Sequence, residues 1–250
     1  MTGRGFQELK TLRHMTWPMV FVFATFSVTT FSYGFDNVVF ATIQAMDDFL
    51  LRFGDTTDPQ TGKPALSALH QAFYNSLGLP AKALGVVVGG ALSNYAGRKP
   101  SFMAMQVLCV VGVGLAYGAR SFGTMLAGRV CLQGFVGWNA LLVPMYSAEI
   151  APAPMRGALV GLFVFAHQFG AFLCSFVTYR SSQHEGSDYA WQLPIAVGFL
   201  FPGLMFLVGW FLPESPRWLV RRNRHAKATE ALRWLHRGTP DFDADAEVRL

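Results

Sequence analysis

Six long apolar stretches dominate this chain of 250 residues. An α-helix needs about 20 apolar residues to cross the hydrocarbon core of a bilayer, and each stretch is long enough to do so. Only 14% of the residues are charged, compared with about 25% in a typical soluble domain. The pattern predicts an all-α fold, a polytopic membrane helix bundle. The predicted membrane segments are 17–43, 72–95, 101–119, 123–146, 158–180 and 190–212.

The basic residues are distributed unevenly between the two sides of this predicted bundle. The chain carries a net charge of +5. With the N-terminus in the cytoplasm, 14 Lys and Arg residues fall on cytoplasmic segments and only four on external loops. Because basic residues favour the cytoplasmic side, we expect an integral membrane protein with both termini cytoplasmic. The membrane that we expect is the plasma membrane. This role for the basic residues argues against nucleic-acid binding.

The polar segments divide the chain into three parts. Residues 1–14 are predicted to form a cytoplasmic arm, residues 15–213 the membrane bundle, and residues 214–250 a cytoplasmic tail that ends in an acidic stretch. The tail contains a pattern typical of an amphipathic helix at a membrane surface. The apolar residues of that helix share one stripe: Ala228, Ala231, Leu232 and Leu235.

The longest external segment, residues 47–70, is polar and predicted to be a loop. Its turn signals are Asp58-Pro59 and Thr61-Gly62. The three cysteines all fall within apolar segments and lack metal-ligand spacing, so we interpret them as small buried apolar residues. They are Cys109, Cys131 and Cys174.

Two charges lie deep in apolar segments, Asp36 in the first and Arg129 in the fourth. A carboxylate at this depth must be neutralised, paired or placed in a water-filled cavity. Burial favours the neutral acid, whereas a nearby guanidinium favours the ionised form, so a carboxylate between these effects could load and release a proton. A static ion pair that holds two helices together is the alternative.

Polar and aromatic side chains at membrane depth could line a cavity for a hydroxylated solute. The alternative is interhelical hydrogen bonding, which is common in membrane bundles. We interpret His167 as a packed histidine and assign no role to Lys82. The candidate solute contacts are Tyr33, Asn37, Asn139 and Gln168.

Three motifs, in order along some 200 residues, resemble the sugar porter family of the major facilitator superfamily, in particular its fungal members. The first is Gly97-Arg98-Lys99, between the second and third segments. The second runs from 128 to 159 and contains Pro144-x-Tyr146, Glu149 and Arg156-Gly157. The third is Pro213-Glu-Ser-Pro-Arg-Trp-Leu219.

The resemblance implies a role for each candidate. Asp36 matches the aspartate that carries the proton in proton-coupled members, and Arg129 matches its electrostatic partner. Tyr33 matches an aromatic residue that contacts the sugar ring. A charged network is implied to hold the cytoplasmic side closed in the outward-facing state. Its members here are Arg98, Lys99, Glu149, Arg156, Glu214 and Arg217.

The sequence departs from the family pattern at two sites. Asn94-Tyr95 stands where the loop motif usually has Asp-Arg, which should weaken the cytoplasmic network. Val164 stands where many members have a sugar-binding glutamine, and Gln168 follows one helical turn later on nearly the same face. Members that carry quinate or polyols resemble this chain there, so we do not expect typical hexose specificity.

The chain also matches only the first six-helix half of a twelve-helix family, in which solute is held between two halves. Three explanations for this length stay open: a truncated product, a half that pairs with a second transporter half, and a fragment. We expect a truncated product.

We therefore predict proton-coupled symport of a sugar or polyol, with the proton as coupling ion and no cofactor. The alternatives are an uncoupled facilitator, a non-transporting sensor and an inactive fragment. We do not expect an enzyme, because we find no nucleophile–base pair, metal cluster or phosphate loop.

Overall fold

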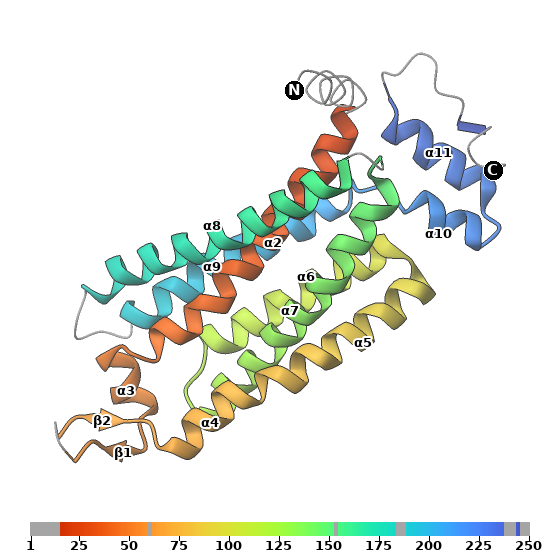
Figure 1. Cartoon of the computed structure of the whole chain (residues 1–250). Coiled ribbons are helices and arrows are strands. Elements are labelled where there is room, and N and C mark those ends of the chain that lie inside the picture. The colour runs from red at the N-terminus through yellow and green to blue at the C-terminus, as the bar shows by residue number, and fades with distance from the viewer. Residues whose placement is uncertain (1–15, 60–61, 153–154, 184–188, 238–243, 246–250) are drawn as a thin grey trace.

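The computed structural model describes residues 16–59, 62–152, 155–183, 189–237 and 244–245. Within this part of the chain, six helical spans are long and apolar enough to cross a membrane, which confirms the predicted bundle. They lie roughly side by side in an elongated bundle (Figure 1). The helices are α2 (Trp17–Ile43), α4 (Ala68–Ser76) continuing into α5 (Gly78–Ala96), α6 (Arg98–Tyr117), α7 (Phe122–Ile150), α8 (Arg156–Ser182) and α9 (Tyr189–Gly209).

Short elements cap one end of the bundle, which we call the hairpin end. They are α3 (Asp47–Phe53) and the antiparallel strands β1 (Thr56–Thr57) and β2 (Pro64–Ala65). Gly62 adopts a φ of 68° in the turn between the strands, a left-handed conformation that favours glycine. The segment predicted as a polar loop therefore holds the predicted turn, but also a helix and a small sheet.

The opposite end, which we call the motif end, carries α10 (Pro216–Arg221) and α11 (His225–Leu235). Ser215 caps α10 by accepting a hydrogen bond from the backbone N–H of Trp218, and Pro216 begins the helix. On α11, the residues Ala228, Ala231 and Leu235 are buried and Leu232 is half-buried. A helix lies where the amphipathic helix was predicted, and its apolar stripe packs mainly against the protein. Its place at a membrane surface stays a prediction. The predicted arm, residues 1–14, lies outside the described residues.

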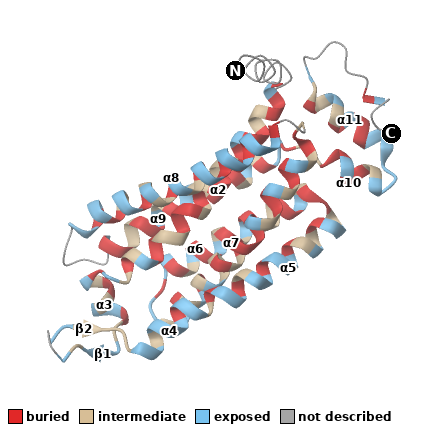
Figure 2. Cartoon of the chain, in the orientation of Figure 1, coloured by how far each residue is buried: buried red, intermediate tan, exposed pale blue. Residues whose placement is uncertain are grey.

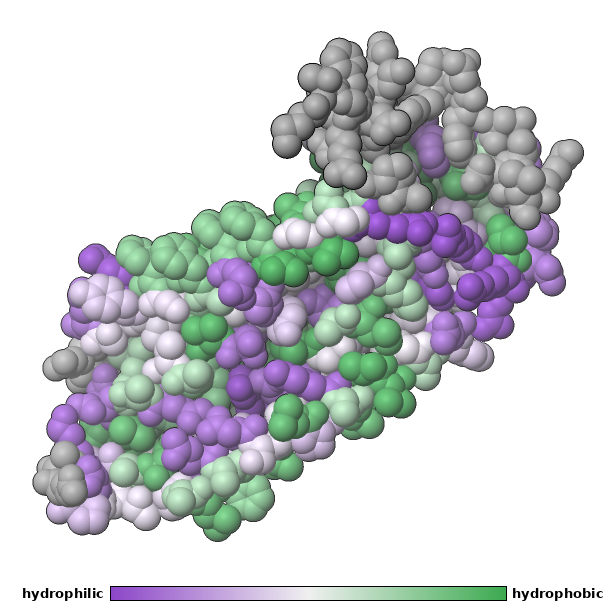
Figure 3. Space-filling model, viewed as in Figure 1, coloured by the Kyte–Doolittle hydropathy of each residue, from purple (hydrophilic) through white to green (hydrophobic). Residues whose placement is uncertain are grey.

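Helix packing follows two sets of close contacts. Helix α2 lies against α8 and α9, whereas α7 lies against α5 and α6. Large apolar side chains fill the interior, including Phe26, Phe35, Phe102 and Phe135. In Figure 2 the exposed faces run along the outer sides of α5 and α8. Figure 3 shows hydrophilic residues gathered at both ends and in a band across the middle of this face.

Glycine permits a close approach between α2 and α8. A Cβ atom at Gly34 would overlap the backbone carbonyl of His167, and one at Gly170 would overlap the carbonyl of Phe31. Backbone atoms cannot rotate away as side chains can, so a larger residue here must push the helices apart. Small residues commonly serve this purpose in membrane bundles.

We expect Gly34→Ala to lower the free energy of unfolding by about 1–3 kcal/mol, the usual range for overpacking. Gly161→Ala is the matched control, because a Cβ at Gly161 on α8 has no atom within 4 Å. That change should leave stability unchanged or raise it by up to about 1 kcal/mol through helix propensity. Denaturant titration of both variants in detergent measures the difference. Equal effects of the two substitutions would contradict the close-packing role of Gly34.

Candidate functional site

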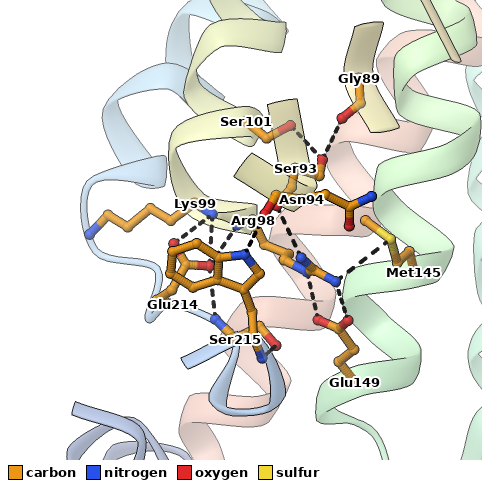
Figure 4. Close-up of polar contacts among 11 residues, drawn as sticks. Gly89, Ser93, Asn94, Arg98, Lys99, Ser101, Met145, Glu149, Glu214 and Ser215 are labelled. Atoms are coloured by element: carbon orange, nitrogen blue, oxygen red, sulfur yellow. Dashed lines mark hydrogen bonds and ion pairs between the residues drawn. The ribbon is translucent and has the colours of Figure 1, made fainter. Parts of the chain in front are cut away.

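The shortest ion pair among the described residues joins α6 to α7 at the motif end (Figure 4). Arg98 donates from Nη2 to Glu149 Oε1 at 2.6 Å and from Nε to Oε2 at 2.9 Å, a two-point pairing. Its Nη1 donates to the backbone carbonyl of Ser93 at 3.0 Å. Arg98 is 2% exposed. Because water has little access to either ion, each charge is stabilised mainly by the other through these two hydrogen bonds.

Glu214, just before α10, binds the start of α6. Its Oε1 accepts from the backbone N–H of Arg98 at 2.6 Å and of Ser215 at 3.0 Å, and Lys99 N lies 3.3 Å from both carboxylate oxygens. Gly97 allows this approach with a φ of 109°, and a Cβ there would collide with the carboxylate. Burial raises the pKa of Glu214, and these hydrogen bonds and the Arg98 charge oppose that shift.

Backbone carbonyls complete this cluster. Trp218 Nε1 donates to the carbonyl of Asn94 at 3.0 Å, and Arg222 Nη2 donates to the same carbonyl at 3.0 Å. Lys99 Nζ donates to the carbonyl of Trp210 at 2.6 Å, and Tyr146 donates to Pro213. Asn94 stands where the family motif usually has Asp, and its backbone carbonyl, not its side chain, binds Trp218 and Arg222 of the tail.

The structure brings four of the six predicted network residues together: Arg98, Lys99, Glu149 and Glu214. Arg156 and Arg217 are exposed, and no hydrogen bond or ion pair joins either one to the cluster in the described part of the chain. We call the four connected residues the motif-end cluster.

The two deep charges lie on neighbouring helices without a direct ion pair between them. Asp36 is 6% exposed and accepts a hydrogen bond from the thiol of Cys109, with 3.7 Å between Sγ and Oδ2. The Arg129 guanidinium lies over the ring of Phe40, 4.4 Å from its centroid. An electrostatic interaction still links Asp36 to Arg129. The coupling role of the pair stays a prediction. Cys109 was not anticipated, since a cysteine in an apolar run gives no signal of a polar contact.

A groove of about 250 Å³ lies between α2, α7 and α8. The rings of Tyr33 and His167 both line it and contact each other, with 4.4 Å between their centroids and an angle of 57° between their planes. Asn139 is 1% exposed and its Oδ1 has no hydrogen-bond partner among the described residues. The lining includes Thr30 and Tyr33 of α2, Asn139 and Pro144 of α7, and Phe163 and His167 of α8.

Two of the four predicted solute contacts, Tyr33 and Asn139, line this groove. Gln168 is exposed and reaches it only through His167, whose Nδ1 lies 2.9 Å from Gln168 Oε1. Asn37 is half-buried and is not part of the lining. His167, interpreted from sequence as a packed histidine, lines the groove. The sequence did contain one signal for this. His167 lies three residues after Val164, which stands where many family members have a sugar-binding glutamine, so the two residues share a helix face.

Comparison with known proteins places the chain in a family. The family model described as "Sugar (and other) transporter" matches residues 22–249. The chain is 29% identical over 223 residues to a "Probable quinate permease" of Aspergillus fumigatus, covering 88% of this chain and 40% of that protein. It is 32% identical over 165 residues to "Myo-inositol transporter 1" of Candida albicans, covering 66% of this chain and 29% of that protein.

Solved structures agree on the fold. The proton:xylose symporter XylE bound to 6-bromo-6-deoxy-D-glucose matches with a TM-score of 0.78 at 23% identity, covering 92% of this chain and 52% of XylE. The inward-open form of XylE from E. coli matches with a TM-score of 0.70 at 25% identity, covering 92% and 56%. The chain spans about 40% of the length of the quinate permease. It belongs to the sugar porter family of the major facilitator superfamily and corresponds to the N-terminal half of its members.

Proposed function

We propose that this chain supplies the N-terminal half of a proton-coupled symporter for a sugar or related polyhydroxylated solute. The observation that carries the proposal is the placement of two features on α2. Tyr33 lines the groove, and Asp36, three residues later, is a buried carboxylate. The names of relatives that carry quinate and inositol, and of a proton:xylose symporter with the same fold, support the solute class.

In this proposal Asp36 carries the coupling proton. An ionised carboxylate at membrane depth is unfavourable unless other groups stabilise it. The thiol of Cys109 and the charge of Arg129 stabilise the ionised form here. Proton uptake removes the attraction to Arg129, and this change in balance would favour a different packing of α2. The proton is the coupling ion, and the proposal requires no cofactor.

The motif end would lie in the cytoplasm, and the chain in the plasma membrane. The excess of basic residues on that side supports this orientation. The motif-end cluster would then hold the inner ends of α6, α7 and α10 together in the outward-facing state. A second transporter half would face the groove, and exposed apolar residues of α5 and α8 such as Val87 and Phe172 are available for that contact.

The test places the chain in proteoliposomes, alone and joined to the second half of the Aspergillus fumigatus quinate permease. Labelled D-glucose, D-xylose, myo-inositol and quinate are the probes, and a dye reports pH in the solute-supplying compartment. We expect uptake of at least one probe together with alkalinisation of that compartment. Uptake without alkalinisation would favour the facilitator. Binding without uptake would favour the sensor, and absence of both would contradict the proposed function.

A further inference from the structure

On the basis of the proposed function, we propose that His167 selects the solute by accepting a hydrogen bond from one of its hydroxyl groups. The groove borders two side-chain acceptors that find no hydrogen-bond partner among the described residues, Nε2 of His167 and Oδ1 of Asn139. A third acceptor is the backbone carbonyl of Ala140, whose regular helical donor position is taken by Pro144. A wall of acceptors requires a ligand that brings donors.

The protonation pattern of His167 follows from its neighbour. Its Nδ1 lies 2.9 Å from Oε1 of Gln168. An amide oxygen only accepts, so Nδ1 carries the hydrogen and donates it. In the neutral imidazole, Nε2 is then left with a lone pair. This Nε2 is buried and has no partner among the described residues.

The second and third acceptors come from α7. Oδ1 of Asn139 is buried without a partner. Pro144 lies inside α7 and has no N–H, so the carbonyl of Ala140, four residues earlier, loses its helical donor. Ala140 and Pro144 both line the groove. A ligand hydroxyl at this place would satisfy groups that the helix itself cannot.

The groove wall also carries donors, the hydroxyl of Tyr33 and the amide nitrogen of Asn139. The hydroxyl of Thr30 is committed to the carbonyl of Phe26 at 2.9 Å. Val143, Phe163 and Val164 contribute only apolar side-chain surface. The wall therefore suits the hydroxyl-bearing face of a polyol, with the Tyr33 ring against its carbon skeleton.

The experiment measures equilibrium binding to the purified 250-residue chain in nanodiscs. The probes are D-glucose and myo-inositol, each with its set of monodeoxyfluoro derivatives. Fluorine keeps the size of a hydroxyl but cannot donate a hydrogen bond. We expect one derivative of the bound probe to lose about three- to tenfold in affinity for the wild-type chain, which is the usual worth of one neutral hydrogen bond.

Substitutions then identify the partner of that hydroxyl. His167→Phe should lose the same factor for the parent probe and show no further loss for that derivative. His167→Gln should restore the discrimination, because its amide oxygen can accept. His225→Phe, at an exposed site on α11, is the matched control and should bind as the wild type does. Circular dichroism and size-exclusion chromatography confirm that each variant is folded.

The outcomes separate this inference from the proposed function. If a parent probe binds and His167→Phe retains the wild-type preference among derivatives, the role of His167 is overturned and the proposed function stands. If no single hydroxyl matters to the wild-type chain, the same conclusion follows. If neither parent probe binds the wild-type chain, the inference fails, whereas the proposed function is decided by the uptake assay with all four probes.

Discussion

Asp36→Asn should abolish uphill accumulation of solute, while exchange and downhill flux continue. The amide keeps nearly the same shape as the carboxyl group, so the packing of α2 against α6 should persist. It cannot take up and release a proton, so solute movement would no longer be tied to the proton gradient. We expect internal solute to reach the external concentration and no more, with no solute-evoked alkalinisation. The measurement uses whichever form of the chain accumulates solute in proteoliposomes.

Asp47→Asn is the matched control for this substitution. Asp47 begins α3 at the hairpin end, where its carboxylate lies 2.7 Å from Lys63 Nζ and both side chains are largely exposed. Screened surface pairs of this kind contribute at most about 1 kcal/mol, so this variant should accumulate solute as the wild type does. Undiminished accumulation by Asp36→Asn would contradict the coupling role of Asp36.

The arrangement of the helices along the chain could be predicted from length and hydrophobicity alone. Their ends depend on individual capping residues, and these were harder to anticipate. The second span begins at Ala68 because Ser67 caps it by accepting from the backbone N–H of His70. The turn near Gly62 was predicted correctly. The helix α3 and the strand pair were not, because short polar elements leave no long-period apolar pattern.

The part of the candidate site that lies in the family motifs could be predicted from the sequence. Arg98 and Glu149 lie 51 residues apart, and the resemblance connected them before the structure showed their contact. The face of α8 that lines the groove could not be predicted in this way. One residue turns a helix by about 100°, so His167 lines the groove while Gln168 is exposed. Gly34 lies against the His167 backbone at this point, and spacing along one helix does not reveal such a contact with another helix.

Arg98→Ala should lower the free energy of unfolding by about 3–5 kcal/mol, the range for breaking a buried ion pair by removing one partner. The Glu149 side chain is 11% exposed, so the substitution leaves a largely buried carboxylate without its two-point partner. It also leaves the carbonyl of Ser93 without its donor. Arg98→Lys should recover only part of the loss, because an ammonium group cannot reproduce the planar two-point geometry. Denaturant titration followed by tryptophan fluorescence measures these differences.

Arg217→Ala provides the matched control, since Arg217 is an exposed arginine of the same motif end and should change stability by no more than about 0.5 kcal/mol. The pair itself is isolated by combining Arg98→Ala with Glu149→Ala. If the two side chains depend on each other, the double variant should lose less stability than the sum of the single variants. Strict additivity would show that the contact between α6 and α7 does not depend on this ion pair. The stability of the motif end would then rest on Glu214 and the backbone hydrogen bonds it accepts from the start of α6.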